Sequence, residues 1–193
     1  PAPLGGGRSW QQQLHSGQRA LPQPALLLGP VTRGFQRGRR LGFPTANLAS
    51  DALVDADRLP SYGVYCGRAV LLDEAAAEAG SLRSYRLTGP SLPAILSWGS
   101  NPQFGLDKAL FEVHIIHWPA SQPAEFYGRT LACLVTHYLR DEARFPGGID
   151  QLTEAIRLDL LVAKALLGPL ADAQDRQLKD RLVRLETAAA SKL

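Results

Sequence analysis

The feature that most constrains the fold is a change in apolar periodicity near residue 148. Before it, apolar runs of strand length alternate with Gly and Pro turns, and no apolar repeat is long enough for a helix. After it, apolar residues recur at helical spacing until Gly168-Pro169 stops the pattern. Successive short strands without intervening helices favour an antiparallel barrel or sandwich, so we predict a mainly β fold with C-terminal helices. The strands are expected at 26–31, 62–72, 92–98, 110–118 and 129–139, and the first helix should bury Ile149, Leu152, Ile156, Leu160, Ala163 and Leu167.

The same pattern divides the chain into three parts. Residues 1–24 are rich in Gly, Pro, Gln and Ser without a period, so we expect a flexible tail, with an acid-poor transit peptide as the alternative. Residues 25–168 form the predicted barrel and its first helix, interrupted by an inserted loop at 73–90. Residues 169–193 are expected to form a second helix and a short tail. In that helix, Leu178, Leu182 and Leu185 should lie on one side.

Composition narrows the class of protein. With 193 residues and 45% hydrophobic content, the chain can bury a core and is not expected to be disordered. No apolar run is long enough to span a bilayer, so we expect no membrane insertion. Cys66 and Cys133 lie within apolar runs and are expected to be buried thiols rather than a disulfide. These properties predict a reduced, soluble, intracellular protein. We expect it to be a monomer.

Charge is unevenly distributed along the chain. Positions 1–50 hold six arginines and no acidic residue, which points to an anionic partner. Four of these arginines lie between residues 33 and 40, among glycines at 34, 38 and 42. Such glycines let a backbone approach a ligand closely, and arginines donate charge-assisted hydrogen bonds to phosphate. Nearby, Thr45 and Asn47 add oxygen atoms suited to Mg²⁺ beside a nucleotide. The segment is not a Walker A loop, because Phe35-Gln36 stands where Lys-Ser/Thr is required. A basic surface loop is the alternative.

This segment is the first of several motifs that occur in a characteristic order. They are Gly38-Arg39-Arg40-Leu41-Gly42-Phe43-Pro44-Thr45-Ala46-Asn47, Tyr62-Gly63-Val64-Tyr65, Asn101-Pro102, Phe111-Glu112-Val113-His114-Ile115, Tyr127-Gly128, Tyr138-Leu139-Arg140-Asp141-Glu142 with Phe145, and Leu152, Ile156 and Asp159. Together they resemble the motifs of the riboflavin kinases, also called flavokinases, over about residues 26–167.

This resemblance implies both a fold and a reaction. The implied fold is a six-stranded antiparallel Greek-key β-barrel with C-terminal α-helices. The implied reaction moves the γ-phosphoryl group of ATP to the 5′-hydroxyl of riboflavin, giving FMN and ADP, with Mg²⁺ as cofactor. Some bacterial relatives carry an additional N-terminal adenylyltransferase domain. Residues 1–24 are too few to encode it, so we expect this chain to be monofunctional.

The resemblance also implies roles for particular residues. Glu112 matches the family's catalytic base, and a carboxylate within an apolar strand is out of place unless it is used or paired. An outward-facing Glu on an edge strand is the alternative. Thr45 and Asn47 are expected to bind Mg²⁺ and the nucleotide phosphates. Arg144 is expected to replace the Lys that some relatives have at Ala143. The remaining ATP-binding residues should be Gly34, Arg39, Arg40, Ile115, His117 and Tyr127, and the flavin-binding residues should be Arg140, Arg144 and Phe145.

The histidines do not predict a metal site. On a strand, His114 and His117 would point to opposite faces, so they cannot share one ion. His114 should instead share a face with Glu112, and we expect it to be a structural histidine of the core or of a strand edge.

The last three residues, Ser191-Lys192-Leu193, form a peroxisomal address that requires a free C-terminus. They predict binding to the peroxisomal import receptor and location in a peroxisome or the related glycosome; without a working signal the protein would be cytoplasmic. The frayed end of an Ala-rich helix is the alternative explanation for this tail.

Three classes of function are therefore considered. The leading hypothesis is an enzyme that uses riboflavin, ATP and Mg²⁺. A nucleic-acid-binding barrel would need exposed aromatic residues among the arginines, and only Phe35 and Phe43 lie near them. A flavin-binding protein without turnover would not need Glu112 or the Pro44-Thr45-Ala46-Asn47 motif. We thus expect no nucleic-acid partner.

Overall fold

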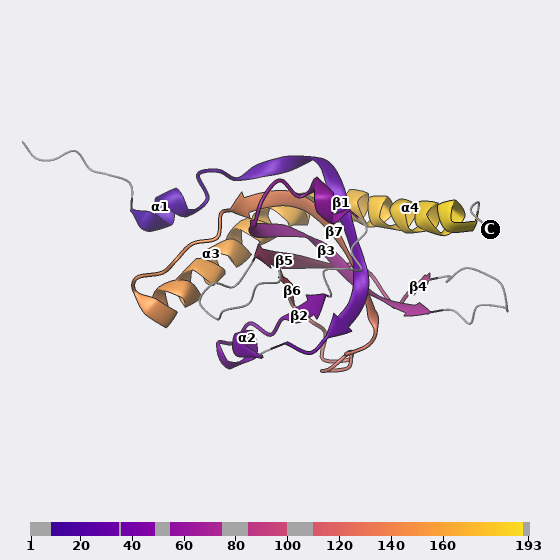
Figure 1. Cartoon of the computed structure of the whole chain (residues 1–193), viewed down its shortest axis with the longest axis horizontal. Helices are drawn as coiled ribbons and strands as arrows, with labels where there is room; N and C mark the ends of the chain where they lie inside the picture. Colours follow the sequence, from indigo (N-terminus) through magenta and orange to yellow (C-terminus); the bar gives the residue numbers. More distant parts are fainter. Residues whose placement is uncertain (1–8, 35, 49–54, 75–84, 100–109, 191–193) are drawn as a thin grey trace, which may run out of the picture.

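The computed structural model describes residues 9–34, 36–48, 55–74, 85–99 and 110–190. Its antiparallel sheet has the strand order β4-β3-β5-β6-β2-β1-β7, and β7 also pairs with β3. The second pairing closes six strands into a ring and leaves β4 outside it (Figure 1). The ring and the helices after it confirm the predicted fold class. The strands are β1 (Arg19–Thr32), β2 (Ala46–Leu48), β3 (Gly63–Glu74), β4 (Tyr85–Leu87), β5 (Leu92–Gly99), β6 (Leu110–Ile115) and β7 (Thr130–Arg140).

Helices and short helical turns connect and follow the strands. Helix α2 and the turn η2 lie before β3, whereas α3, η4 and α4 follow the last strand. The helices are α1 (Trp10–Leu14), α2 (Arg37–Arg40), α3 (Gly148–Leu167) and α4 (Ala171–Ala190), with 3₁₀ turns η2 (Ala56–Arg58) and η4 (Gly168–Leu170).

Side chains on the ring alternate between its interior and its outer face, as the period of a strand requires. On β6, Phe111, Val113 and Ile115 are buried in the interior cluster. Glu112 and His114, which stand between them, are half-buried on the opposite face. The expectation that these two residues share a face is therefore confirmed.

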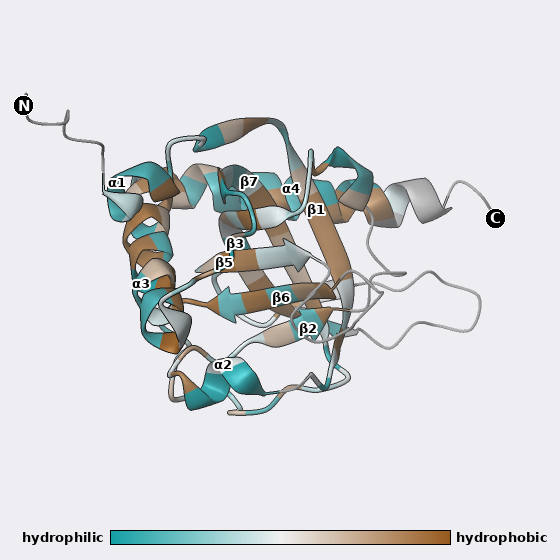
Figure 2. Cartoon of the chain, turned by 60° about the vertical axis from the view of Figure 1, so that its left-hand side comes forward, coloured by the Kyte–Doolittle hydropathy of each residue, from teal (hydrophilic) through white to brown (hydrophobic). Residues whose placement is uncertain are grey.

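Helices α3 and α4 cover separate parts of the outer face (Figure 2). On α4, Leu178 and Leu182 are buried against outward side chains of β1, β3 and β7, and Leu185 is partly buried beside them. This confirms the predicted apolar side of the second helix. Burial of these apolar surfaces provides the main free energy that holds both helices to the ring.

The predicted buried face of α3 is correct only in part. Ala163 and Leu167 are fully buried, but Ile149 is 63% exposed. The apolar cluster under α3 includes the helix only from Ile156 onward, so the first turn has no apolar surface to cover it in the described structure. The buried face also contains the carboxylate of Asp159, which the apolar period could not reveal.

The prediction of a tail over residues 1–24 is wrong for much of its described part. Ser9 begins α1 with a capping box: its hydroxyl accepts a hydrogen bond from Gln12 N, and the Gln12 side chain accepts one from Ser9 N. Helix α1 lies beside α3 (Figure 1). Strand β1 then starts at Arg19, six residues before the predicted boundary at residue 25.

The predicted inserted loop at 73–90 is partly strand. Residues 72–74 of β3 pair with residues 85–87 of β4. Positions 75–84, together with Asn101-Pro102 and the Ser191-Lys192-Leu193 tail, lie outside the described residues.

Both cysteines are placed as the sequence predicts. Cys66 and Cys133 are buried and unbonded to each other. Burial raises the pKa of both thiols, that of Cys66 to about 12, so they remain protonated at neutral pH. Among the described residues, no helix combines the length and apolar character that crossing a bilayer would require.

Candidate active site

The Gly-Arg segment folds into a compact turn that delivers the Thr45–Asn47 stretch to the sheet. Gln36 adopts a left-handed conformation with φ of 55° and starts α2. Gly42 turns the chain back with φ of 85°, a conformation that glycine adopts without strain. The Phe43 N–H then donates to the Gly38 carbonyl oxygen at 2.8 Å. Because of this turn, Gly38 of α2 lies close to Phe43 and Thr45, and the arginines lie on a short helix rather than along an extended loop.

A line of polar residues crosses the sheet at this point. In β-sheet register, Asn47 of β2 lies opposite Glu112 of β6, and Glu112 lies opposite Ser97 of β5. On the other side, Asn47 lies opposite Thr32 of β1. We call Thr32, Asn47, Glu112 and Ser97 the polar row. Directly opposed residues on neighbouring strands lie about 5 Å apart, so the row brings together residues from distant parts of the sequence.

The carboxylate of Glu112 is the electrostatic centre of this row. Burial raises the pKa of Glu112, and the positive charge of Arg37 opposes that shift. Arg37, on α2, therefore faces the candidate base. The sequence groups Arg37 with the other arginines of this segment, but it does not predict the specific effect of Arg37 on Glu112.

Asn47 offers an oxygen suited to a cation. Its side chain is only 6% exposed, and its Oδ1 has no hydrogen-bond partner within the described part of the chain. Gly34 lies directly against the Asn47 side chain, where any Cβ would collide with the amide group. A buried carbonyl oxygen without a donor is costly, whereas it is a normal ligand for Mg²⁺. The side-chain oxygen of the predicted metal ligand Asn47 thus fits a hard cation, and the second predicted ligand, Thr45, precedes it by two residues. No cluster of three or more His, Cys, Asp or Glu suited to a metal occurs among the described residues.

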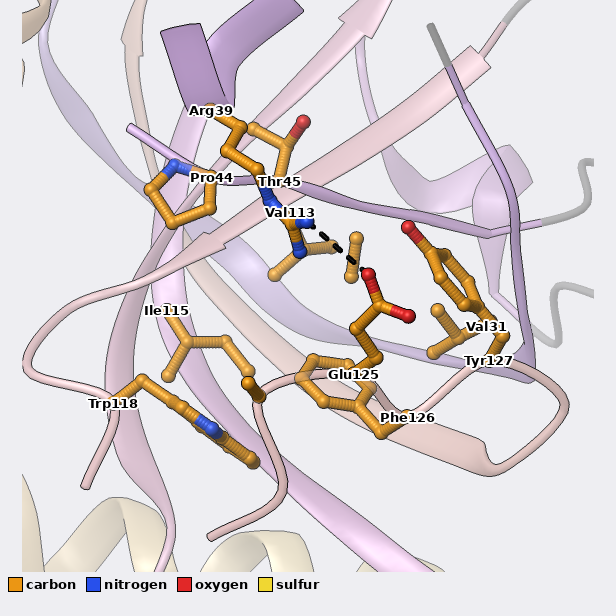
Figure 3. A pocket seen from close by; sticks show the side chains of 12 residues that line it. Val31, Arg39, Pro44, Thr45, Val113, Ile115, Trp118, Glu125, Phe126 and Tyr127 are labelled. Carbon is orange, nitrogen blue, oxygen red and sulfur yellow. Dashed lines mark hydrogen bonds and ion pairs between the residues drawn. The ribbon is translucent and has the colours of Figure 1, made fainter. Parts of the chain in front are cut away.

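A pocket lies next to α2, and inward-facing residues of β2 and β6 form part of its wall (Figure 3). Four residues of the predicted ATP-binding set line it: Arg39, Thr45, Ile115 and Tyr127. At its mouth the Arg39 guanidinium donates to the Glu125 carboxylate at 3.1 Å. We call this hollow, whose open volume is about 520 Å³ including adjoining solvent, the nucleotide pocket. Its apolar wall includes Trp118 and Phe126, whose rings lie 4.8 Å apart and which the motifs did not predict.

Tyr127 is held by contacts with the chain before α2. Its hydroxyl accepts a hydrogen bond from Gln36 Nε2 at 3.3 Å, and the Arg33 guanidinium lies 5.2 Å from the centre of its ring. Together with the Arg39–Glu125 pair, these contacts connect the Gly-Arg segment to the loop before β7.

Some predicted ATP-binding residues do not line this pocket. Asn47 and Gly34 are absent from its lining; they lie against each other, and Asn47 lies opposite the candidate base Glu112. Arg40 is exposed at the end of α2, and His117 is exposed after β6 with φ of 59°. The structure therefore separates Arg40 and His117 from the residues that surround the nucleotide pocket.

His114 has a structural explanation, as expected. Its Nδ1–H donates to the Pro44 carbonyl oxygen at 2.8 Å, and Phe43 packs edge-on against its ring. Burial lowers the pKa of His114, which keeps the imidazole neutral. The residue therefore fixes the chain just before Thr45.

The predicted flavin segment lies on the other side of the polar row. Val64 of β3 lies opposite both Ser97 of β5 and Arg140 of β7, so the register continues from Glu112 to Arg140. Arg140 Nε and the Nη2 group donate to the two carboxylate oxygens of Asp159 at 2.9 and 2.8 Å. The guanidinium also lies 5.6 Å from the centre of the Phe145 ring. Arg140 is thus committed to a buried ion pair, a contact that the motifs did not predict.

Arg140, Arg144 and Phe145 line one pocket, which we call the C-terminal pocket. Its open volume is about 750 Å³ including adjoining solvent, and residues from the N-terminal region also line it. The structure therefore brings the three predicted flavin-binding residues together, with Arg144 exposed and Phe145 half-buried.

Comparisons with known proteins show what the chain is similar to. The Flavokinase family, described as riboflavin kinase, matches residues 21–167. The chain is 39% identical to the riboflavin kinase of Emericella nidulans over 169 residues, covering 76% of this chain and 78% of that protein. It is 34% identical to the riboflavin kinase of Mus musculus over 148 residues, covering 75% of this chain and 81% of that protein. A crystal structure of riboflavin kinase from Trypanosoma brucei shares the fold, with a TM-score of 0.53 at 24% identity over 80% of this chain and 87% of that one.

Proposed function

Because the chain belongs to the riboflavin kinase family, we propose that its polar row transfers the γ-phosphoryl group of ATP to the 5′-hydroxyl of riboflavin. The products are FMN and ADP. The chain is an enzyme, the first of the three classes that its sequence suggested. The observation that carries the assignment of the catalytic centre is the register of Glu112 with Asn47. It places a half-buried carboxylate beside an unpaired amide oxygen.

Glu112 is assigned the role of general base. The reaction forms a bond between the 5′-oxygen of riboflavin and the γ-phosphorus, and it breaks the bond from that phosphorus to the β–γ bridging oxygen. The hydroxyl proton must leave as the new bond forms, and Glu112 takes it. Burial raises the pKa of this carboxyl and so makes it a stronger base, while the charge of Arg37 keeps it available in the deprotonated form.

Thr45 and Asn47 are assigned to Mg²⁺ through the hydroxyl and amide oxygens. When bound, the ion neutralises charge on the transferred phosphoryl group. The buried Oδ1 of Asn47 supports this assignment because nothing else in the described structure satisfies it. Gly34 contributes by leaving room for the Asn47 side chain.

The nucleotide pocket is assigned to ATP. Ile115, Trp118 and Phe126 provide apolar surface for the adenine ring, and Tyr127 lies beside them. Arg39 is placed to donate to phosphate oxygens because it is exposed at the mouth of the pocket. Arg40, on the same short helix, can contribute positive charge without lining the pocket.

The C-terminal pocket is assigned to the flavin ring. The register from Arg140 to Glu112 crosses three strand-to-strand steps, or roughly 14 Å at the usual strand spacing. An extended ribityl chain can then carry the 5′-hydroxyl from the pocket toward the polar row.

A turnover assay tests the proposal. The protein is incubated with riboflavin, ATP and Mg²⁺, and FMN is measured by chromatography. In Glu112→Gln the turnover rate should fall roughly 10²- to 10⁴-fold, because the amide cannot accept the proton. The variant should still bind ATP. Glu154→Gln provides a matched control, since Glu154 is a solvent-accessible carboxylate on α3. If Glu112→Gln kept near-normal turnover, the assigned base would be wrong.

For the cellular location, we propose import into a peroxisome or glycosome through Ser191-Lys192-Leu193. Support comes from the match of this tripeptide to the receptor-read address. A fluorescent protein fused to the C-terminus should block import because the receptor needs a free end, whereas an N-terminal fusion should be imported. Identical distribution of the two fusions would contradict the proposal.

A further inference from the structure

Helix α1 borders the C-terminal pocket, although it lies far from Arg140 in the sequence. Trp10, Gln13 and Leu14 of α1 and the following Ser16 and Gly17 all line the same pocket as Phe145. Trp10 and Leu14 are half-buried there. The pocket is therefore incomplete without the segment that precedes β1.

Three contacts hold α1 in this position. The capping box of Ser9 and Gln12 fixes the first turn. His15, directly after the helix, donates from Nε2 to the Asp159 carboxylate at 2.8 Å. Arg19 lies with its guanidinium 4.3 Å from the centre of the Tyr138 ring and donates to the Gly17 carbonyl oxygen.

His15 connects α1 to the 140–145 segment, because His15 and Arg140 share the carboxylate of Asp159. Asp159 accepts hydrogen bonds from both His15 and Arg140, and its side chain is 1% exposed. Because Arg140 also faces Phe145, the same carboxylate positions residues on the α1 and the Phe145 sides of the pocket. Helix α1 and the 140–145 segment are therefore placed relative to each other by a buried network.

The chemistry of the lining suits a planar heteroaromatic ring. Trp10 and Phe145 offer aromatic surface, and the Arg140 guanidinium is planar as well. The two arginines of the lining, Arg140 and Arg144, are balanced by Asp141 and Glu142. A lining with balanced charge and aromatic surface favours an uncharged ring with polar edges over a phosphate.

We propose that α1 forms the N-terminal wall of the flavin pocket and that Trp10 contacts the isoalloxazine ring of riboflavin. This inference rests on the proposed function, because it takes the C-terminal pocket to be the flavin site. It assigns a substrate-binding role to a segment outside the 21–167 range that the family matches. Trp10 then determines affinity for riboflavin and has no role in binding ATP.

The test compares Trp10→Ala with Trp118→Ala in the full chain. Loss of an aromatic contact worth about 1.4 kcal/mol corresponds to a roughly 10-fold change in affinity. Trp10→Ala should raise the KM for riboflavin by about that factor and leave the KM for ATP unchanged. Trp118→Ala should do the reverse, since Trp118 lines the nucleotide pocket. Trp10→Phe keeps an aromatic ring and should restore most of the riboflavin affinity.

A binding measurement separates contact from folding. Riboflavin is titrated into the Glu112→Gln protein, with and without Trp10→Phe, and quenching of flavin fluorescence is recorded. A tryptophan in contact with the ring should quench it, and replacement by Phe should reduce the quenching at saturation. Unchanged quenching together with an unchanged riboflavin KM in Trp10→Ala would overturn the inference.

Phe145→Ala distinguishes the inference from the function on which it rests. If Phe145→Ala raises the KM for riboflavin but Trp10→Ala does not, the flavin site stands and the role of α1 is wrong. If neither variant changes the riboflavin KM while FMN is still formed, the assignment of the C-terminal pocket to flavin is itself wrong. Equal losses for riboflavin and ATP in Trp10→Ala, without rescue by Phe, would show a structural role only.

Discussion

Arg39 and Arg140 were both expected to contact substrates, yet they lie in opposite surroundings. Arg39 and its partner Glu125 are each 48% exposed, and one hydrogen bond joins them. Arg140 is 7% exposed and donates twice to Asp159, which is 1% exposed. Exposed ion pairs add little to stability, whereas breaking a buried pair is costly. Arg39 can therefore turn to a ligand at little cost, and Arg140 cannot.

This difference teaches that residue type and motif position do not determine a residue's role by themselves. The surroundings decide whether an arginine is free to bind or is committed to the fold. Arg140 still lines the C-terminal pocket, but its guanidinium is held in place there by Asp159. A comparison of stability and affinity in matched variants can test this division.

The largest expected effect is on the stability of Arg140→Ala. This change leaves the buried Asp159 carboxylate with His15 as its remaining partner. Breaking a buried pair from one side typically costs about 3–5 kcal/mol, and we expect a loss of that size in the free energy of unfolding, measured by urea denaturation. Arg39→Ala is the control and should change the same quantity by less than about 1 kcal/mol. Similar losses in both variants would remove the distinction between the two arginines.

The sequence predicts the surroundings of Arg39 better than those of Arg140. Residues 34–47 form one continuous segment, so its glycines, arginines and hard oxygens are visible together. Strand alternation also predicts that Glu112 and His114 share a face, which the structure confirms. Local patterns of this kind depend only on neighbouring residues and on the period of the element.

The contacts that the sequence does not predict join distant segments. The Arg140–Asp159 pair depends on how α3 packs against the ring, so the motif that contains Asp159 does not reveal its partner. Glu125 meets Arg39 across 86 positions of sequence. For α1 a signal was present, since Ser9 and Gln12 have capping-box spacing. A helix of only five residues is too short to show an apolar period, so the capping-box spacing alone did not predict it.

The next largest effect is expected for the affinity of Arg39→Ala for ATP. Loss of a charged hydrogen bond to phosphate is worth about 1.5–3 kcal/mol, so the KM for ATP should rise roughly 10- to 100-fold. The KM for riboflavin should not change. Arg39→Lys keeps the charge and should lose less. An unchanged KM for ATP in Arg39→Ala would show that the exposed arginine is no more available to the substrate than the buried one.

Arg37 adds an intermediate case, because it is half-buried and faces Glu112. Its charge lowers the pKa of Glu112, which burial raises. A general base works when deprotonated, so turnover should fall as pH drops through the pKa of Glu112. Arg37→Gln removes the lowering influence, and the acidic limb of the turnover profile should move to higher pH. The profile is measured as kcat against pH, with Arg157→Gln on the exposed side of α3 as control. A shift to lower pH would contradict this role.

The smallest expected effect concerns Glu125, whose carboxylate accepts a hydrogen bond from Arg39 in the ligand-free protein. In the proposed function, ATP must displace this carboxylate to bind Arg39. Both partners are half exposed, so their pairing is worth about 0.2–1 kcal/mol. Glu125→Gln removes the carboxylate that occupies Arg39, and the KM for ATP should fall by a factor of about 1.5 to 5. The effect should shrink at high salt, because exposed charges are screened. Glu154→Gln is the matched control on α3. A rise in the KM for ATP would mean that Glu125 holds Arg39 in the orientation that phosphate requires. The exposed pair would then be part of the binding site, just as the buried pair is part of the fold.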